Sequence, residues 1–339
     1  MSWADARVWA LVGVGVAAAS CGGKGEPATA RPRPFAGPRS GLTGEMVFTG
    51  ACDASGAVRV SGSLVAVADD EDNLLRVYDS AAPGKPTAVV DTGSVMPDER
   101  RKPPEMDLEA AARIGDRIYW LASHGRKKSG KRAPSRLRIF ATDVVAGENL
   151  AFVGTPYSHL VDDLAAVPGL DLGEAAAMSP RDEGGLNIEG LGETATGQLL
   201  LGFRSPVPEG RALILPIENP AAMIERGERA VFGAPIRLDL GGRGVRAMER
   251  DGARQYIVGG GTGARMLAAE LYVWDGGGAA RPMAGVRFGD LNPEALALIG
   301  RRLLVVSDDG ERPMGRRVCK KLKDRAARQF RAAWLSEKL

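Results

Sequence analysis

Short apolar runs recur in groups of three along this chain, and each run ends at a polar or glycine-rich cluster. Before each group stands a five-residue pattern: a small or polar residue, any residue, a charged or hydroxyl residue, Gly or Ala, then an apolar or small residue. The residues at its centre are Ser55, Glu109, Glu189, Arg246 and Glu294. The first apolar runs after these centres span residues 64–68, 118–121, 199–203, 256–258 and 303–306.

From each central residue to the next polar cluster is about 14 residues, enough for a strand, a tight turn and a second strand. A third apolar run follows in every unit, for example at residues 74–78, 137–140 and 271–274. Units of about 40–60 residues made of successive short strands are typical of propeller blades. We therefore predict an all-β fold, a five-bladed β-propeller. Residues 159–178 break the strand rhythm and predict a short helical insertion between blades 2 and 3.

The N-terminal residues 1–21 have the features of a lipoprotein-type signal peptide. An apolar stretch follows Arg7, and Ala18-Ala19-Ser20-Cys21 resembles the lipobox that is cleaved before a lipidated cysteine. The stretch is too short for a permanent membrane span. Cys21 is then the lipidation site, and Gly22 after it favours the periplasmic side of the outer membrane in the cell envelope. An ordinary secretory signal and a cytosolic chain are the alternatives.

Three segments follow from this pattern: the signal peptide 1–21, a flexible linker 22–43 rich in Gly, Pro, Ala and Arg, and one propeller domain 44–339. The chain has 339 residues, 44% hydrophobic and 26% charged, as is ordinary for a globular protein. A net charge of +3 is too small to indicate nucleic-acid binding. We expect a monomer that contacts the membrane only through its lipid anchor.

Two cysteines remain in the mature domain, Cys52 at the opening of the first blade and Cys319 in the last. A closed propeller places these blades side by side, and an exported compartment permits a disulfide there. A disulfide still requires the two Cα atoms to come within about 7 Å. Two free, partly buried thiols are the favoured expectation, with a disulfide as the alternative.

The first strand of each blade lines the channel of a propeller, so the five central residues are expected to converge on its axis. The small residue after each centre leaves room for the neighbouring blades. Strand direction alternates within a blade, so the ends of the second strands lie on the same face as the starts of the first. Around that channel mouth we expect Asp69, Asp70, His124, Arg126, Arg204, Asp308 and Asp309.

Three carboxylates in one ring repel each other unless a cation or an arginine compensates. Arg246 can neutralise one of them. Glu109, Glu189 and Glu294 are therefore candidate ligands of a hard cation, Ca²⁺ first, with no other cofactor expected. The alternative is a structural role in which the ring fastens one blade to the next.

Other chemistry finds little support. Ser123 and His124 are adjacent and the chain has no Gly-x-Ser-x-Gly elbow, which argues against a catalytic triad. Two histidines without suitable cysteine spacing argue against zinc. The basic cluster formed by residues 126–128 with Lys131 and Arg132 is expected near the mouth, where it can attract an anion.

Several strings resemble a bacterial domain-of-unknown-function family of exported β-propeller proteins, similar to the esterase-like phytase propellers. They lie at residues 51–55, 69–73, 107–109, 123–126, 184–190, 202–204, 244–246 and 292–294. The resemblance spans roughly residues 45–335 and implies a propeller in the cell envelope, without an established reaction. At Ala110 the family pattern usually has Gly.

Two functional hypotheses follow. In the first, a lipid-anchored propeller binds a small anionic ligand or an envelope protein at the channel mouth, without catalysis. In the second, a Ca²⁺-dependent phosphoesterase or esterase of phytase-like type uses a cation on the ring glutamates to activate water, while Arg126, Arg204 or Arg246 holds the oxyanion.

Overall fold

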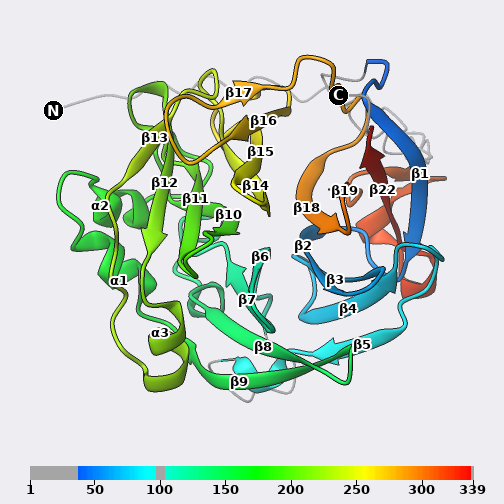
Figure 1. Cartoon of the computed structure of the whole chain (residues 1–339), viewed down its shortest axis with the longest axis horizontal. Coiled ribbons are helices and arrows are strands. Elements are labelled where there is room, and N and C mark those ends of the chain that lie inside the picture. Colours follow the sequence, from blue (N-terminus) through cyan, green and yellow to red (C-terminus); the bar gives the residue numbers. More distant parts are fainter. Residues whose placement is uncertain (1–36, 97–103, 337–339) are drawn as a thin grey trace, which may run out of the picture.

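The computed structural model describes residues 37–96 and 104–336, and in it five four-stranded antiparallel sheets surround a central axis (Figure 1). The predicted five-bladed β-propeller is confirmed. The predicted signal segment 1–21, with Cys21, lies outside the described residues. No helix in the described part of the chain is long and apolar enough to cross a membrane.

Each blade runs from an inner strand at the axis to an outer strand at the rim. The first blade contains β2 (Ala54–Ser61), β3 (Leu64–Asp69), β4 (Leu74–Asp79) and β5 (Ala88–Asp91). The second contains β6 (Leu108–Ile114), β7 (Arg117–Ala122), β8 (Ile139–Val145) and β9 (Asn149–Tyr157). The third contains β10 (Asn187–Glu193), β11 (Leu199–Ser205), β12 (Ala212–Ile217) and β13 (Ile236–Leu238). The fourth contains β14 (Gly244–Asp251), β15 (Arg254–Gly260), β16 (Glu270–Trp274) and β17 (Arg281–Pro282).

The fifth blade combines both ends of the described chain. It contains β18 (Pro293–Ile299), β19 (Arg302–Ser307), β22 (Gln329–Leu335) and, on the outside, β1 (Leu42–Thr49). The register runs antiparallel from Leu42 opposite Leu335 to Thr49 opposite Gln329. The N-terminal strand thereby closes the ring, a connection that the sequence pattern did not predict.

Five apolar clusters form the core, one between each pair of neighbouring blades. The alternation of strand side chains explains this arrangement. In β3, Val65 and Val67 pack toward the fifth blade, whereas Ala66 and Ala68 pack toward the second. Each blade therefore buries both faces, and no blade has a core of its own.

Short helices decorate this ring. The predicted insertion between blades 2 and 3 is present as α1 (Leu160–Ala165) and α2 (Leu172–Ala177), and the leucines Leu160, Leu164 and Leu172 join the core between those blades. A third helix, α3 (Pro220–Arg226), lies within the third blade. Single 3-10 turns occur at Gly93–Val95, Pro134–Arg136, Pro208–Gly210, Cys319–Lys321 and Arg325–Ala327.

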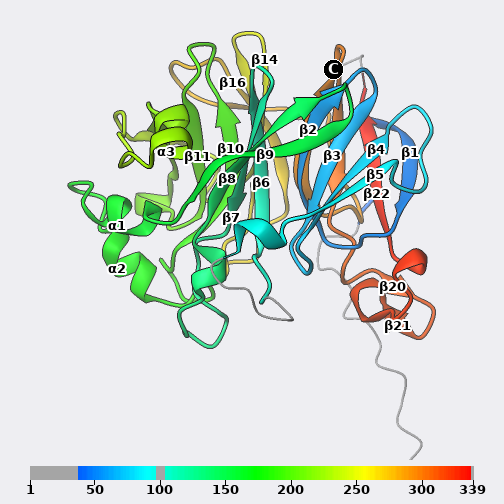
Figure 2. The same cartoon turned by 90° about the horizontal axis from the view of Figure 1, so that it is seen from below.

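Between β19 and β22 the chain leaves the sheet at the end where the inner strands begin (Figure 2). We call residues 308–328 the cap segment. It contains the hairpin β20 (Pro313–Met314) and β21 (Arg317–Val318) and two of the 3-10 turns.

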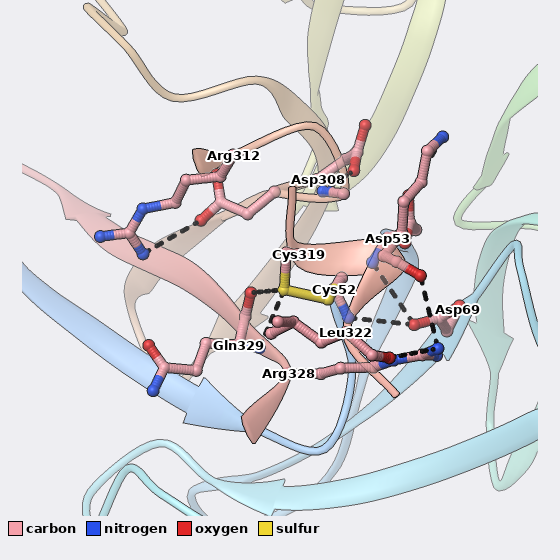
Figure 3. The surroundings of a disulfide bond; sticks show 12 residues. Cys52, Asp53, Asp69, Asp308, Arg312, Cys319, Leu322, Arg328 and Gln329 are labelled. Atoms are coloured by element: carbon pink, nitrogen blue, oxygen red, sulfur yellow. Dashed lines mark hydrogen bonds and ion pairs between the residues drawn. A yellow bond between two sulfur atoms is a disulfide. The ribbon is translucent and has the colours of Figure 1, made fainter. Parts of the chain in front are cut away.

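A disulfide ties the cap segment to the first blade. Cys52 and Cys319 are bonded, with their Cα atoms 5.9 Å apart, and both are fully buried (Figure 3). The expectation of two free thiols is therefore wrong. Sequence reasoning placed the two blades side by side but not the cap segment, whose fold brings Cys319 within bonding range.

Candidate functional site

The five central residues of the repeat are all bulge residues. In every inner strand the pairing skips one residue: Ala54 and Gly56 pair with adjacent residues of β3, and Ser55 between them has no partner. The same shift leaves out Glu109, Glu189, Arg246 and Glu294. A bulge of this kind bends a strand and redirects a side chain. The repeat in the sequence is therefore a repeat of bulges at the start of each inner strand.

Small residues follow the bulges because the inner strands approach closely. A Cβ atom added to Gly56 would lie 3.1 Å from the backbone of Ala110, and one added to Gly190 would lie 2.5 Å from the side chain of Val245. The remaining cavity at the axis, lined by four of the bulge residues, is about 10 Å³. That is no larger than one water molecule. The channel is filled here and leaves no room for a ligand on the axis itself.

On one side of the ring, arginines compensate the bulge carboxylates. Glu189 forms ion pairs with Arg204 of its own blade and, at 3.3 Å, with Nε of Arg246 of the next blade. Arg246 also pairs with Glu294 of the fifth blade. Burial lowers the pKa of the Arg204 guanidinium, but the carboxylates of Glu189, Glu109 and Asp308 together outweigh it and the net shift is upward.

Asparagines two residues before these bulges complete the pairing. Asn187 Nδ2 donates to Glu189 and Asn292 Nδ2 donates to Glu294, each at 2.8 Å. Asn292 Nδ2 also donates to Asp308 Oδ2 at 2.9 Å. Blades 3 and 5 thus share an Asn-x-Glu arrangement in which the amide satisfies the carboxylate.

The first and second blades replace this asparagine by aspartate, at Asp53 and Asp107. As a result five carboxylates gather on this side of the mouth. Oxygens of Asp53, Asp69 and Asp70 all lie within 4.8 Å of one another, and so do oxygens of Asp70, Asp107 and Glu109. Asp70 belongs to both groups. We call these five residues the acidic cluster.

Two members of the acidic cluster already have partners. Asp69 Oδ2 accepts hydrogen bonds from the backbone N–H groups of Cys52 and Asp53, at 3.1 and 3.3 Å. Asp107 pairs with Arg136 at 2.6 Å. These contacts hold the two carboxylates in place.

The other three members carry unused oxygens. Asp53 is only 4% exposed, and its Oδ2 atom has no hydrogen-bond partner among the described residues. The buried Oδ1 atom of Asp70 likewise has none within the described chain. Arg204 and Arg246 lie within electrostatic reach of Glu109, yet no hydrogen bond to its carboxylate is found in the described ranges. Buried charges without partners are costly.

Burial and mutual repulsion raise the pKa values across the cluster. Burial, then the charges of Asp308 and Asp69, raise the pKa of Asp53 to about 8. The pKa of Asp70 is well above its usual range because of burial and the neighbouring Glu109. Burial and Glu189 act in the same direction on the pKa of Glu109. The cluster therefore favours either bound protons or a bound cation.

Lys320 of the cap segment flanks one end of the cluster. Its Nζ atom lies 4.0 Å from Asp53 Oδ1, 3.2 Å from Glu71 Oε1 and 2.8 Å from Glu311 Oε1. The backbone of the cap segment also packs against Asp53, because a Cβ atom added to Gly310 would lie only 1.6 Å from Asp53 Oδ1. The cap segment thus covers Asp53 directly.

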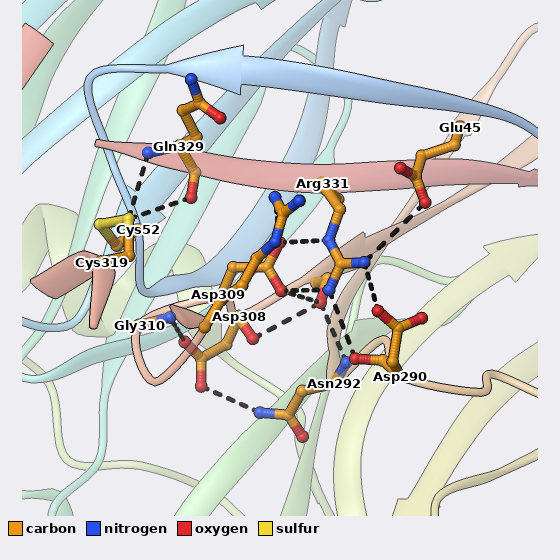
Figure 4. Close-up of polar contacts among 12 residues, drawn as sticks. Glu45, Cys52, Asp290, Asn292, Asp308, Asp309, Gly310, Cys319, Gln329 and Arg331 are labelled. Carbon is orange, nitrogen blue, oxygen red and sulfur yellow. Dashed lines mark hydrogen bonds and ion pairs between the residues drawn. A yellow bond between two sulfur atoms is a disulfide. The ribbon is translucent and has the colours of Figure 1, made fainter. Parts of the chain in front are cut away.

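A buried arginine anchors the start of the cap segment. Arg331 of β22 donates to Asp309 at 2.7 and 2.9 Å and to Asp290 at 2.6 Å (Figure 4). Both Arg331 and Asp309 are almost fully buried. Asp309 therefore has a structural role, whereas its neighbour Asp308 lies nearer the axis, where it accepts from Asn292 and from Gly310 N–H.

Three residues predicted at the mouth have other surroundings. The buried His124 ring contacts the Ala122 carbonyl oxygen through Nδ1 at 2.7 Å, and burial lowers its pKa to about 4. Arg126 donates to the carbonyl oxygens of Ala176 and Gly130. Ser55 donates to the Leu108 carbonyl oxygen and so joins the first two blades. The structure does not bring these three side chains into the acidic cluster.

Sequence reasoning missed Asp53, Asp107 and Lys320 as site residues. Asp53 and Asp107 occupy the first position of the repeated pattern, where blades 3 and 5 have asparagine. The sequence therefore already distinguishes two kinds of repeat, those that begin with asparagine and those that begin with aspartate, and this difference could have indicated different roles. Nothing in the sequence pattern points to Lys320, because its place depends on the cap segment.

Comparisons with known proteins match part of the chain to a family model that carries no assigned activity. A family model described as "Protein of unknown function (DUF3616)" matches residues 159–292. No curated protein sequence matches the chain.

Solved propeller-like structures are similar at low identity. The glutaminyl cyclase of Myxococcus xanthus is 11% identical, with a TM-score of 0.45 over 86% of this chain and 95% of that one. The PQQ-bound aldose sugar dehydrogenase of Streptomyces coelicolor is 12% identical, with a TM-score of 0.40 over 86% of this chain and 98% of that one. Propellers carry many unrelated functions, so these likenesses assign no activity.

Proposed function

We propose that this protein binds a divalent cation, Ca²⁺, through the acidic cluster and uses the ion to hold a small anionic ligand at the channel mouth. The observation that carries the proposal is a pair of buried carboxylate oxygens, Asp53 Oδ2 and Asp70 Oδ1, that have no hydrogen-bond partner in the described part of the chain and lie among carboxylates of like charge. A bound cation would supply the positive charge that compensates these two carboxylates.

The donor set fits a hard cation. Every candidate ligand in the cluster is a carboxylate oxygen, which Ca²⁺ prefers and zinc does not. Two oxygens on one Ca²⁺ at about 2.4 Å lie at most about 4.8 Å apart, and both triads of the cluster meet that limit. Asp70 belongs to both triads, and it is free to bind together with Asp53 in the first or Glu109 in the second, while Asp69 and Asp107 are positioned by their own partners.

The small molecule at the mouth is expected to be anionic, because the chain offers few carboxylate oxygens to coordinate the ion. Ca²⁺ takes six to eight oxygens, so coordination positions stay open toward the mouth. The basic cluster (residues 126–128 with Lys131 and Arg132) also lies near the cap segment. Lys128 is one of the charges that lower the pKa of Glu311 there, with a smaller effect than Lys320 and Lys321. Lys127, Lys131 and Arg132 in the same loop are exposed. A bound carboxylate or phosphate would thus meet the ion from one side and this loop from another.

The test is thermal melting of the full chain after treatment with EDTA and then with added Ca²⁺ or Mg²⁺. An ion at a hundred times its Kd should stabilise the fold by about 2.7 kcal/mol. We expect the shift in the wild type and in Glu148→Gln, an exposed control, and its loss in Asp70→Asn. An unchanged melting temperature of the wild type at millimolar Ca²⁺ would overturn the proposal.

A second candidate function is a Ca²⁺-dependent phosphoesterase. It is favoured by Arg204, whose guanidinium lies within electrostatic reach of Glu109 and could contact a phosphoryl oxygen on the ion. Hydrolysis of p-nitrophenyl phosphate that requires Ca²⁺ and is lost in Asp70→Asn would support it. Binding of phosphate without turnover would leave the binding function alone.

We also infer that the protein works in the cell envelope, anchored through Cys21. The Cys52–Cys319 disulfide supports an oxidising compartment. Membrane fractionation of the wild type and of Cys21→Ala tests this inference. We expect the wild type with the membranes and the variant in the soluble fraction, and equal soluble amounts would contradict the anchor.

A further inference from the structure

Lys320 stands out among the charged residues of the mouth because it is the one lysine of the described chain in contact with the acidic cluster. It belongs to the cap segment and not to any blade. Its ammonium group is half-buried and faces Asp53, Glu71 and Glu311. Its position is fixed from two sides, by the disulfide at the preceding residue and by its own N–H group, which donates to the Gly310 carbonyl oxygen at 3.1 Å.

We propose that Lys320 is an internal counter-cation that sets the affinity of the mouth for its divalent ion. This inference rests on the proposed function, and it assigns to the cap segment a role in regulating the same site. The ammonium group lies on the Asp53 side of the cluster, so it reduces the negative charge that an incoming ion meets there. Its Nζ atom approaches Asp53 on the Oδ1 side, at 4.0 Å, and leaves Oδ2 without a partner among the described residues.

The same geometry locates the ion. The positive charge of Lys320 repels a divalent cation that approaches Asp53. Oxygens of Asp70 and Glu109 lie within 4.8 Å of each other, and in the described chain no lysine or arginine forms an ion pair with either carboxylate. The ion is thus expected on Asp70, which belongs to both triads, and displaced from Asp53 toward Glu109, away from Lys320. Lys320 then weakens binding without occupying the binding position.

Removing the charge should tighten ion binding. Loss of one unit charge beside a divalent ion changes its affinity by roughly tenfold at an effective dielectric between those of protein and water. We expect Lys320→Met to bind Ca²⁺ roughly tenfold more tightly than the wild type at low ionic strength, with a smaller gain at 0.5 M salt because of screening. Lys320→Arg keeps the charge and should keep the wild-type affinity. Lys323→Met, an exposed lysine of the same segment, should also match the wild type.

The experiment is calorimetric titration of Ca²⁺ into the four full-length proteins, with melting curves in EDTA and in saturating Ca²⁺. Lys320→Met should melt below the wild type in EDTA, since three carboxylates lose their partner, and should gain more from Ca²⁺. Equal Ca²⁺ affinities of Lys320→Met and the wild type would overturn the role of Lys320 and leave the proposed function standing. Absence of binding by both proteins would overturn the two proposals together.

Discussion

Arg246 and Glu294 form an ion pair between the bulges of the fourth and fifth blades, and both side chains are only 11% exposed. The same guanidinium faces Glu189 of the third blade. One arginine therefore connects three successive blades at the axis, where the inner strands leave no space for water beyond a single molecule.

Replacement of this arginine by an apolar residue should destabilise the ring strongly. Arg246→Met leaves the buried Glu294 without its arginine and Glu189 with Arg204 alone, which costs about 3–5 kcal/mol. Urea unfolding followed by tryptophan fluorescence measures the loss. Arg281→Met is the matched control, because its pair with Asp275 is exposed and should contribute less than about 1 kcal/mol. Equal effects of the two substitutions would contradict the role assigned to Arg246.

The same substitution at two ring glutamates should have opposite effects. Glu189→Gln removes a charge that two arginines share, and should lower the free energy of unfolding. Glu109→Gln removes a buried charge that repels its neighbours, and in EDTA should raise the free energy of unfolding. Chemical unfolding of both variants beside the wild type tests the contrast. A loss of stability in Glu109→Gln would show that this carboxylate is compensated in the folded protein.

Asp53 should make stability depend on pH. Its pKa is about 8 in the folded protein, above the ordinary value of an unfolded aspartate. The folded state then holds a proton that the unfolded state releases, so this contribution is complete below about pH 4 and is lost as the pH rises toward 8. In EDTA, Asp53→Asn should melt with the wild type near pH 4 and about 3 °C or more above it at pH 8. Parallel curves at all pH values would contradict the shifted pKa.

The disulfide should stabilise the closed ring. Cys52 and Cys319 are 267 residues apart in the sequence, so the bond closes a large loop. The double variant Cys52→Ser/Cys319→Ser is expected to lose about 2–5 kcal/mol. Urea unfolding with and without dithiothreitol gives the measurement. The reductant should lower the stability of the wild type alone, and equal sensitivity of the variant would point to a different target.

The sequence revealed the propeller because its repeat reports on a backbone feature. A bulge needs a side chain that can leave the pairing and a small residue where the next strand approaches, as at Glu189 and Gly190. Both requirements are local, and they recur in each blade. The number of blades and the placement of the helical insertion follow directly from such local signals.

The acidic cluster was harder to predict because its members come from three separate connections. Asp53 precedes β2, Asp69 and Asp70 lie at the end of β3, and Asp107 precedes β6. Lys320, which flanks the cluster, comes from the cap segment. The pattern identified Asp69, Asp70 and Glu109, since they belong to the ends of strands. The role of β1 as the outer strand of the fifth blade was missed for a similar reason, because a strand that pairs with the far end of the chain has no local mark.

The path of the chain into the fifth blade has a consequence for how the molecule would sit on a surface. Arg39 donates to Asp290 at 2.9 Å, and Gly37 lies against Gly289, just before β18 begins at the mouth. Gly37 therefore lies on the mouth side of the ring, and the 16 residue steps that separate it from Cys21 span at most about 55 Å. With a lipid on Cys21, this length of chain would keep the mouth within about 55 Å of the bilayer, close enough to meet a ligand that the membrane carries.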